Sequence, residues 1–502
     1  MLYVSTRDRD RHTNASTAIV RGLAPDGGLF APQRISGCDG FWETLMDKSY
    51  AQRAASVLAS FLDDFSMDEL DEYARLAYES GHFDDCGPAP VRTLPNGLSI
   101  LELMHGPTAA FKDMALQMLP HLLTASLRKC GEEREVFVLT ATSGDTGKAA
   151  LEGFRDVPGT RVLVFYPKDG VSNIQERQMV TQQGGNVGVC AVHGNFDDTQ
   201  TGVKKLFRDK ALAEEMNSLG LFFSSANSIN LGRLAPQVAY YFSAYCDMVG
   251  QGSIPPGAPI PICVPTGNFG NILSALYAWE MGLPMSKLLC ASNRNDVLTD
   301  FLNSGTYDRR RPFHRTYSPS MDILVSSNLE RALFLLSDGS DDLARKCMAD
   351  LNGIGRYTVP HALKRAFDRR FYAGSGDDEQ TLETIAALWT ESGYLADPHT
   401  AVAVRVAEDY RRETGDLTPM LVVSTASPYK FCAPVLEALG AKAGNEGDAL
   451  IERLFDLTGW PVPEGLQGLS GRTVRFTEVV NPEDMRQCVI SYAQPAEPGV
   501  VG

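Results

Sequence analysis

The sequence lacks the features of a membrane protein or a secreted protein. None of its apolar runs approaches the roughly 20 residues that a helix needs to cross a bilayer. The N-terminal stretch MLYVSTRDRDRH is charged and has no apolar core of a secretory signal. We therefore expect a protein of the cytoplasm that makes no contact with a membrane.

Cysteine pairs are also missing. The 10 cysteines are spread singly along the chain, with no CxxC pair and no dense framework. This spacing fits reduced thiols in a reducing compartment better than a disulfide scaffold. We expect the cysteines to be small buried residues, and we expect no metal site.

Positive charge is scarce. There are 46 lysines and arginines against 62 aspartates and glutamates, so the formal net charge is −16. This excess repels nucleic acids, so we expect no nucleic-acid partner, and an anionic ligand has to meet local positive charge. With 44% hydrophobic and 22% charged residues, the chain can bury a large core. At about 100–200 residues per domain, its length predicts two to four domains.

Short apolar runs alternate with helix-length segments through the middle of the chain. The runs are VFVLTAT (136–142), RVLVFYP (161–167), VGVCAVHG (187–194), IPICVPT (260–266) and PMLVVSTAS (419–427). Because parallel strands need crossover helices, this rhythm predicts an α/β protein with mostly parallel sheets flanked by helices. Ligands of such sheets bind beyond the carboxyl ends of the strands. Functional residues are therefore expected directly after these runs.

The two ends of the chain differ from this pattern. Residues 1–98 contain the turn-rich LAPDGGLFAPQ (23–33), followed by helical stretches such as YAQRAASVLASFLDDF (50–65). We interpret residues 1–98 as an N-terminal cap domain. Residues 493–502, AQPAEPGVVG, are predicted to be a loose C-terminal tail.

One lysine, Lys112, opens an amphipathic helical pattern in HGPTAAFKDMALQMLPHLL (105–123). Apolar residues recur there at helical spacing: Phe111, Met114, Met118, Leu119 and Leu122. A helix N-terminus and apolar neighbours both disfavour the ammonium form, and a partly neutral lysine can form a Schiff base. Taken alone, Lys112 also fits a surface lysine followed by a capping Asp113. Pro120 predicts a kink or a break in the helix.

Three other segments follow predicted strands. PTGNFGN (265–271) joins a strand to a helix with small residues, which suits a phosphate monoester. ATSGDTGKAALEGF (141–154) offers the hydroxyls, carboxylate and N–H groups of Ser143, Gly144, Asp145 and Thr146, which suit a carboxylate or a phosphate. In STASPYKF (424–431), the Thr425 hydroxyl can share a hydrogen bond with a neutral ring nitrogen. Each also has an ordinary explanation: a strand-to-helix turn, a helix cap at Asp145, or a turn hydroxyl.

In this order the four segments closely resemble the threonine synthase family, pyridoxal-phosphate enzymes of the tryptophan-synthase-β fold group, fold type II. The resemblance covers nearly the whole chain. The other stretches that look like the longer, bacterial and fungal form are LAPDGGLFAP (23–32), YPKDGVSNIQERQMVTQQGGNV (166–187), GNFDDTQTGVKKLF (194–207), SANSINLGRLAPQVAYYF (225–242), SPSMDILVSSNLER (318–331) and ADPHTAVA (396–403).

The resemblance implies roles for single residues. Lys112 would hold pyridoxal phosphate covalently, and Thr425 would meet the pyridine nitrogen. Gly267, Asn268, Phe269 and Asn271 match the cofactor phosphate loop, which leaves 143–146 for the substrate. The family's tail motif often reads TAHPAKF, and the sequence here is TASPYKF, so the motif departs at Ser427 and Tyr429.

The resemblance also implies a domain plan and a reaction. A large cofactor-binding domain would comprise residues 99–133 and 221–492, and a small α/β domain would comprise residues 134–220. The family converts O-phospho-L-homoserine and water to L-threonine and phosphate. The phosphates of substrate and cofactor need local cations, for which the candidates are Lys148, Lys168, Arg177, Arg233 and Lys430. His105 is a candidate for orienting the Lys112 loop, but a packed, hydrogen-bonded histidine is the more common case.

Three alternatives stay open. A serine/threonine dehydratase or a cysteine synthase would share Lys112 and the phosphate loop, but not the long cap or the SGDTG turn. A catalytically silent protein that binds a phosphorylated metabolite would need neither Lys112 nor Thr425. A nucleotide-binding Rossmann protein fits least, because no GxGxxG motif follows an early strand. The oligomeric state does not follow from the sequence.

Overall fold

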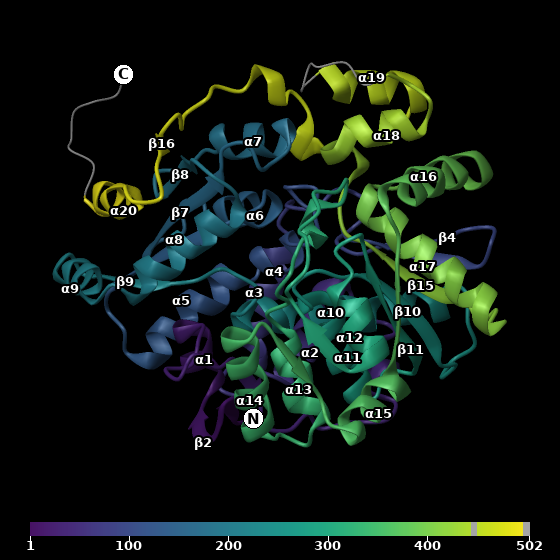
Figure 1. Ribbon diagram of the computed structural model, residues 1–502, viewed down its shortest axis with the longest axis horizontal. Helices are drawn as coiled ribbons and strands as arrows, with labels where there is room; N and C mark the ends of the chain where they lie inside the picture. The colour runs from purple at the N-terminus through teal and green to yellow at the C-terminus, as the bar shows by residue number, and fades with distance from the viewer. Residues whose placement is uncertain (443–448, 495–502) are drawn as a thin grey trace.

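The computed structural model describes residues 1–442 and 449–494. Most of the predicted tail, from residue 495 onward, lies outside this range. Two sheets organise the described chain, and in Figure 1 the small sheet lies on the left and the large sheet on the right, with α10 (Leu231–Gly250) between them.

Among the described residues, six strands form the large sheet. Their order is β14 (Phe371–Ser375), β11 (Met285–Ser292), β10 (Ile260–Pro265), β15 (Met420–Ser424), β5 (Leu98–Glu102) and β4 (Val91–Thr93). All neighbours are parallel except β4 and β5. The central strands are buried along their length because helices cover both faces.

The small sheet is parallel throughout. Its order is β16 (Val479–Val480), β8 (Val187–Val192), β7 (Thr160–Pro167), β6 (Glu135–Ala141) and β9 (Leu221–Ser224). The predicted α/β class with parallel sheets flanked by helices is confirmed, and each of the five apolar runs contains a strand.

Helices cover both sheets. Around the small sheet lie α5 (Leu119–Cys130), α6 (Asp145–Gly153), α7 (Asn173–Val180), α8 (Phe196–Arg208), α9 (Lys210–Ser218) and α20 (Met485–Ala493). The large sheet is covered by α11 (Gly270–Glu280), α12 (Val297–Ser304), α15 (His361–Arg370) and α17 (Pro398–Thr414). Beyond these lie α13 (Leu329–Leu336), α14 (Asp341–Gly353), the hairpin β12 (Thr306–Asp308) and β13 (Arg356–Thr358), α16 (Asp378–Ser392), α18 (Cys432–Ala438) and α19 (Ala449–Thr458). In the part of the chain that the structure describes, no helix has the length and apolar character of a membrane span.

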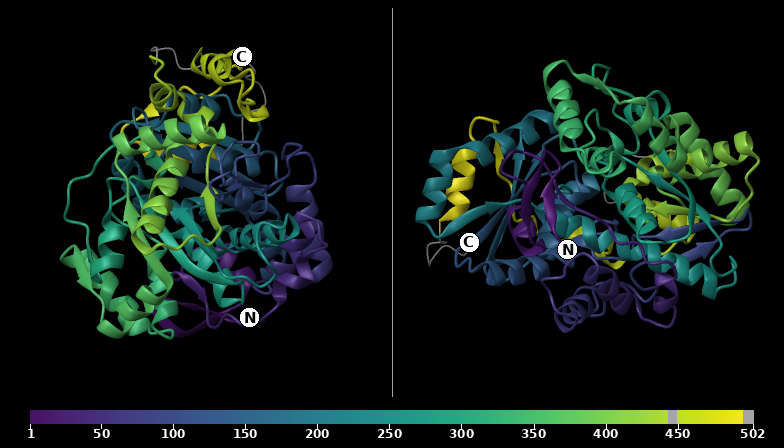
Figure 2. Two further views of the ribbon diagram at one scale, coloured as in Figure 1. Left: turned by 90° about the vertical axis from the view of Figure 1, so that its right-hand side faces the viewer. Right: turned by 90° about the horizontal axis from the view of Figure 1, so that it is seen from below.

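The N-terminal part packs against the centre of the molecule (Figure 2, purple). A small antiparallel sheet, β2 (Asp8–Thr13), β1 (Tyr3–Ser5) and β3 (Phe30–Pro32), is followed along the chain by α2 (Tyr50–Ala59) and α3 (Met67–Tyr78). The helix α1 (Ala15–Arg21) packs on α5, and α2 packs on α10. The N-terminal part therefore shares the hydrophobic core of the sheets.

The predicted domain boundaries remain a prediction, and sheet membership favours an adjustment. Strand β4 already belongs to the large sheet, and β9 and β16 belong to the small one. We propose that the cap ends before residue 91, and that the small domain takes in residues 221–224 and the segment 478–493.

Candidate active site

The chain leaves β5 and forms the loop that carries Lys112. Backbone pairing joins this loop to the end of β15: the Phe111 N–H donates to the Thr425 carbonyl at 2.8 Å, and the Ser427 N–H donates to the Ala109 carbonyl at 3.0 Å. Lys112 and Thr425 are thus fixed next to each other. The two residues are 9% and 6% exposed, so the surface-lysine interpretation is wrong.

Asp113 shapes the loop from inside. Its carboxylate accepts from the Thr108 N–H at 2.8 Å and from the Thr108 hydroxyl at 2.7 Å. Gly106 faces the same carboxylate so closely that a Cβ would lie 2.6 Å from it. Burial raises the pKa of Asp113 to about 6. Asp113 therefore holds the loop and does not act as a surface helix cap.

The predicted helix is broken next to Pro120, as the proline predicted. α4 (Asp113–Leu116) ends before α5 begins at Leu119, with Pro120 in the first turn of α5. Because α4 has only four residues, its dipole is a minor influence on Lys112. Burial is the largest cause that lowers the pKa of Lys112, and the nearby cations Lys430 and Arg233 lower it further.

Asp145, the first residue of α6, is the anion at the centre of the site. Its carboxylate contacts the Lys112 Nζ at 3.5 Å and the Lys430 Nζ at 2.6 Å, and it accepts from the Gln175 amide at 2.8 Å. Although burial disfavours its charge, the two lysines hold the pKa of Asp145 well below its usual range. Asp145 makes no capping hydrogen bond, so the helix-cap interpretation is wrong.

Lys430 links the two sheets. It is fully buried, and its Nζ also donates to the Thr108 carbonyl at 2.8 Å. Asp145 comes from the small sheet, whereas Lys430 and Thr108 follow strands of the large sheet. The ion pair of Asp145 and Lys430 therefore joins the two halves of the site.

The rest of the loop 143–146 is open to a ligand. Thr142 fixes the turn, because its hydroxyl accepts from the Gly144 N–H at 3.0 Å and the Gly147 N–H at 2.8 Å. The hydroxyls of Ser143 and Thr146 are half-buried, and within the described residues neither has a hydrogen-bond partner.

The loop 267–271 joins β10 to α11, and its shape suits a phosphate. Phe269 adopts a positive φ of 62°, and a Cβ on Gly267 would lie 2.5 Å from the Ser320 carbonyl. The Gly267 carbonyl accepts from the Ser326 hydroxyl at 2.8 Å, and the Asn268 carbonyl accepts from the Asn328 N–H at 3.0 Å. In the described part of the chain no side chain caps the N-terminus of α11, which leaves its N–H groups for an anion.

Asn271 supplies an orphaned donor beside this loop. Its carbonyl oxygen accepts from the hydroxyls of Tyr240, at 2.6 Å, and Tyr241. Its amide nitrogen is buried and has no partner among the described residues. An unpaired buried donor is costly, so this one indicates a ligand group that completes it. The donor and the loop fit the phosphate of pyridoxal phosphate.

The five candidate cations differ in their partners and in their exposure to solvent. Lys148 is paired with Glu152 at 3.0 Å and also contacts Gln182. Arg177 donates to carbonyls of residues 469–472, and Lys168 is exposed. Of the five predicted cations, Lys430 and Arg233 are the two whose charge acts directly on Lys112.

Arg233 is buried without an acid. It lies in the first turn of α10, the helix that follows β9 along the chain, and is 2% exposed. One Nη donates to the Ala226 carbonyl at 2.9 Å, whereas Nε has no partner among the described residues. Burial lowers the pKa of Arg233 to about 10, and no carboxylate of the described ranges offsets this effect. Such an arginine is expected to receive an anionic ligand.

Sequence reasoning missed Gln175 and Thr142. Gln175 belongs to the capping box of α7, since its amide oxygen accepts from the Ser172 N–H at 3.1 Å, and its amide nitrogen reaches Asp145. The capping-box pattern was visible in SNIQ, but the contact with Asp145 depends on the tertiary fold. Thr142 lies at the very end of a predicted strand, where its hydroxyl could have been expected to stabilise the turn.

His105 lies between two carboxylates at the start of the Lys112 loop. Its Nδ1 contacts Asp84 at 2.7 Å, and its Nε2 contacts Glu102 at 3.0 Å. Although burial disfavours the imidazolium, these carboxylates raise the pKa of His105 to about 9. These contacts are those of a packed, hydrogen-bonded histidine, and a role of His105 in orienting the Lys112 loop stays a prediction.

We expect this histidine to make stability depend on pH. The folded-state pKa of about 9 lies above the unfolded value of about 6.5, so the stabilisation is full below pH 6.5 and disappears as the pH rises through 9. The free energy of unfolding of the wild type should exceed that of His105→Gln by about 2 kcal/mol near pH 6, since Asp84 is partly exposed. Urea titrations at several pH values measure the difference, and a difference independent of pH would contradict the prediction.

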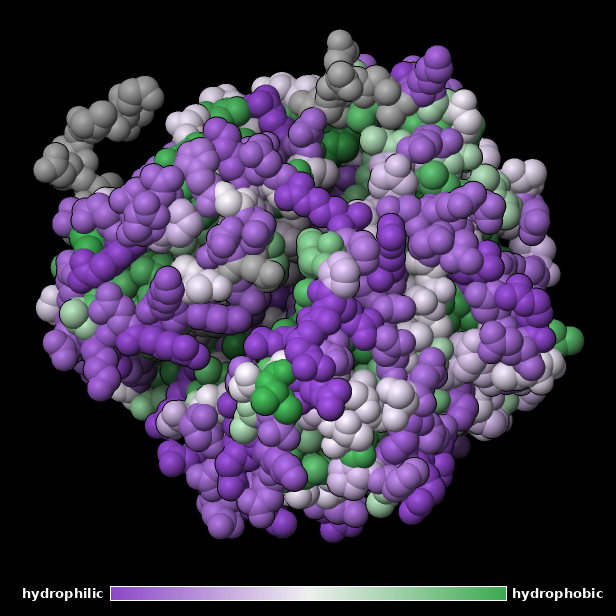
Figure 3. All heavy atoms as spheres, viewed as in Figure 1, coloured by the Kyte–Doolittle hydropathy of each residue, from purple (hydrophilic) through white to green (hydrophobic). Residues whose placement is uncertain are grey.

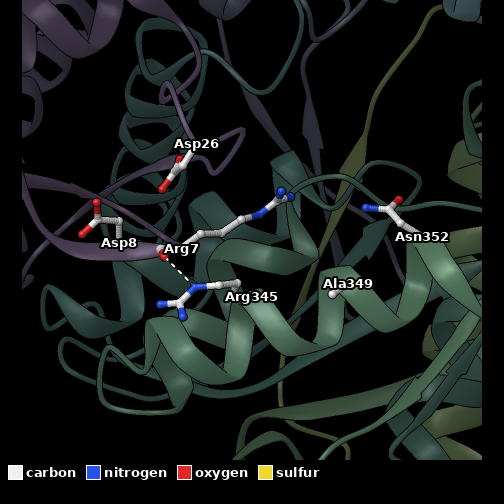
Figure 4. Close-up of a pocket in the computed structure, with 6 residues that line it drawn as sticks. All are labelled: Arg7, Asp8, Asp26, Arg345, Ala349 and Asn352. Atoms are coloured by element: carbon white, nitrogen blue, oxygen red, sulfur yellow. Dashed lines mark hydrogen bonds between the residues drawn. The ribbon is translucent and has the colours of Figure 1, made fainter.

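A separate cavity lies away from these residues. It has a volume of about 410 Å³ and is lined by Arg7, Asp8, Asp26, Arg345, Ala349 and Asn352 (Figure 4). Both arginines are already engaged, Arg7 with Glu330 at 2.8 Å and Arg345 with Asp341 at 3.3 Å. By contrast, the face in Figure 3 is hollowed near its centre, between the parts of the molecule that hold the two sheets.

Comparisons with known proteins agree with the geometry. Three family models match: threonine synthase N terminus over residues 2–78, pyridoxal-phosphate dependent enzyme over 84–426, and threonine synthase, C-terminal over 400–489. The chain is 41% identical to human threonine synthase-like 1 over 86% of its length, and the match spans 58% of that relative. It is 38% identical to Pseudomonas aeruginosa threonine synthase, with 91% of this chain and 93% of the relative covered.

Solved structures are similar over the whole fold. A crystal structure of threonine synthase from Brucella melitensis with bound pyridoxal phosphate has a TM-score of 0.86 and 35% identity, covering 99% of this chain and 100% of that one. Threonine synthase from yeast also has a TM-score of 0.86, with 32% identity and 98% of each chain covered.

Proposed function

Because the chain belongs to the threonine synthase family of pyridoxal-phosphate-dependent enzymes, we propose that it converts O-phospho-L-homoserine and water to L-threonine and phosphate. The observation that carries the choice of substrate is Arg233, a buried cation beside Lys112 with no acidic partner among the described residues. A phosphorylated amino acid brings an anion that pairs with this guanidinium.

The cofactor has a set of residues suited to it. Lys112 would hold it, Gly267, Asn268, Phe269 and Asn271 would bind its phosphate, and the Thr425 hydroxyl would meet its pyridine nitrogen. Among the described residues this hydroxyl has no hydrogen-bond partner, so it is available to a ring nitrogen. Bound pyridoxal phosphate supplies an electron sink that allows protons to leave Cα and Cβ of an amino acid.

Lys112 is the residue placed to move those protons. Burial, Lys430 and Arg233 all favour its neutral amine, and a neutral Nζ can accept a proton and return it. Asp145 opposes this effect, but its carboxylate is shared with Lys430 at 2.6 Å. Lys430 therefore limits how strongly Asp145 holds Lys112 in the ammonium form.

The loop 143–146 is proposed to hold the substrate carboxylate. Its open hydroxyls at Ser143 and Thr146 and the N-terminus of α6 offer donors to an anion. Arg233, whose charge acts on Lys112, would receive the phosphate. Two separate anion sites besides the cofactor loop suit a substrate with an anion at each end.

A substrate comparison tests this proposal. We expect purified protein loaded with pyridoxal phosphate to release phosphate from O-phospho-L-homoserine and to form L-threonine in equal amount. L-serine and L-threonine at matched concentration should be deaminated poorly. Rapid serine deamination without phosphate release would favour a dehydratase, and binding of phosphohomoserine without turnover of any substrate would favour a silent binding protein.

A further inference from the structure

Three side chains that can bind metals converge at the outer edge of the small sheet. The Sγ atoms of Cys190 and Cys488 and a carboxylate oxygen of Glu478 all lie within 4.8 Å of one another. They come from three elements that are far apart in the sequence: β8, the residue before β16, and α20. In the right-hand view of Figure 2, yellow α20 lies beside the blue elements of this sheet.

Backbone register explains why the two thiols meet. Gly188 and Cys190 are two residues apart on β8 and share a face, and Cys488 and Tyr492 are one turn apart on α20 and share a face. A Cβ on Gly188 would lie 2.3 Å from the Tyr492 ring, so the glycine allows α20 to approach β8 closely. One turn earlier along α20, this approach places Cys488 against Cys190.

Glu478 is held at the same place by its backbone. The Ala191 N–H donates to the Glu478 carbonyl at 3.0 Å, and the His193 N–H donates to the Val480 carbonyl at 2.9 Å. Glu478 is exposed, whereas the two cysteines are 0% and 3% exposed. The site therefore has two buried soft ligands and one hard ligand that opens to solvent.

The charges around the pair suit a cation. The Glu478 carboxylate is an anion beside two buried thiols. A divalent cation offsets its charge and favours the thiolate forms of both cysteines.

The other cluster of this kind differs in a decisive way. Asp84, Cys86 and His105 also lie close together, but both ring nitrogens of His105 contact carboxylates and its pKa is raised to about 9. An imidazolium cannot donate a lone pair to a metal. In the cluster at β8 and α20, the Cys190 Sγ donates to the Ala191 carbonyl at 3.5 Å, a hydrogen bond that is lost when the thiol gives up its proton to bind a metal.

We propose that Cys190, Cys488 and Glu478 form a binding site for a thiophilic divalent cation of the zinc class, which fastens α20 and β16 to β8. Zn–S bonds of about 2.3 Å in tetrahedral geometry place two sulfur atoms less than about 4 Å apart, which needs only a small closure of the cluster. Binding releases the two thiol protons, and water takes the fourth position. The sequence gives no sign of this cluster, because its side chains are brought together only by the fold.

Cobalt substitution tests the proposal on the full-length, reduced holoenzyme. Cleared of metal with a chelator and titrated with Co²⁺, the protein should bind one ion per chain and show the intense red-region bands of tetrahedral thiolate-bound cobalt. Cys488→Ser should remove the bands. Cys347→Ser is the matched control, since Cys347 is also 3% exposed but is not part of the cluster, and it should keep them.

A surface variant covers the case in which Cys488→Ser does not fold. Glu478→Gln changes an exposed residue and should weaken Co²⁺ binding by at least the roughly 10-fold that loss of an outer-shell partner costs. The proposal is overturned if the reduced wild type gives no cobalt bands, if the bands survive Cys488→Ser, or if Glu478→Gln binds Co²⁺ as tightly as the wild type. It is equally overturned if the two thiols form only a disulfide under air and bind no metal when reduced.

Discussion

Lys112→Ala is expected to lower turnover of O-phospho-L-homoserine by at least roughly 10⁴-fold, because one substitution removes both the covalent anchor of the cofactor and the base that moves protons. The fold should survive, since Asp145 keeps Lys430 at 2.6 Å and Gln175 at 2.8 Å as partners. Phosphate release under saturating substrate measures the effect, and a urea titration checks the fold.

Chemical labelling separates Lys112 from the other buried lysine of the site. Lys112 and Lys430 contact the same carboxylate, so either one could in principle carry the cofactor. Borohydride reduction of the wild type followed by peptide mapping should place the pyridoxyl group on Lys112. A label on Lys430, or a Lys112→Ala protein that retains turnover, would refute the assignment.

Arg233→Met should have the second largest effect. Methionine retains the apolar bulk of the side chain but removes the buried cation, so binding of the substrate phosphate loses a charge-assisted contact. Truncating one partner of a buried charge pair costs about 2–5 kcal/mol, which corresponds to a decrease in kcat/KM of roughly 30- to 3,000-fold. The decrease in kcat/KM should be larger for O-phospho-L-homoserine than for a substrate without phosphate, which loses only the effect of the Arg233 charge on Lys112.

Lys168→Met is the matched control for this experiment. Lys168 was a candidate from the same sequence reasoning, but it is exposed. Its substitution should leave kcat/KM within about twofold of the wild type, as expected for a surface charge. If Arg233→Met behaves like Lys168→Met, Arg233 does not receive the phosphate, and the case for a phosphorylated substrate loses its main support.

The fold could be predicted because strands and helices alternate in the sequence. Continuous apolar runs such as 161–167 became buried parallel strands, and Pro120 marked the break between α4 and α5. The membership of β16 in the small sheet could not be predicted, because two valines carry no periodic signal and the pairing partner lies far away in the sequence.

The site was predicted in part. The positions of Lys112, Thr425 and the loop 267–271 after strand ends follow from the rule that ligands bind at carboxyl ends of parallel strands. Of the two causes predicted for a lowered Lys112 pKa, the apolar surroundings are confirmed as burial, whereas α4 is too short for a strong dipole and two cations take its place. Arg233 could be chosen among the five cations only once the burial of each side chain and its hydrogen-bond partners were known. The spacing of residues along the sequence does not contain this information.

Strand β16 is synthesised late, and this affects how the chain folds during translation. During translation, β8 is made almost three hundred residues before the strand that covers its open side, so the nascent small sheet exposes an unpaired edge for most of synthesis. Such edges pair readily with other chains. Shortened chains that end before residue 478 should therefore aggregate on release from the ribosome, even though every residue of the proposed catalytic site has been made by then.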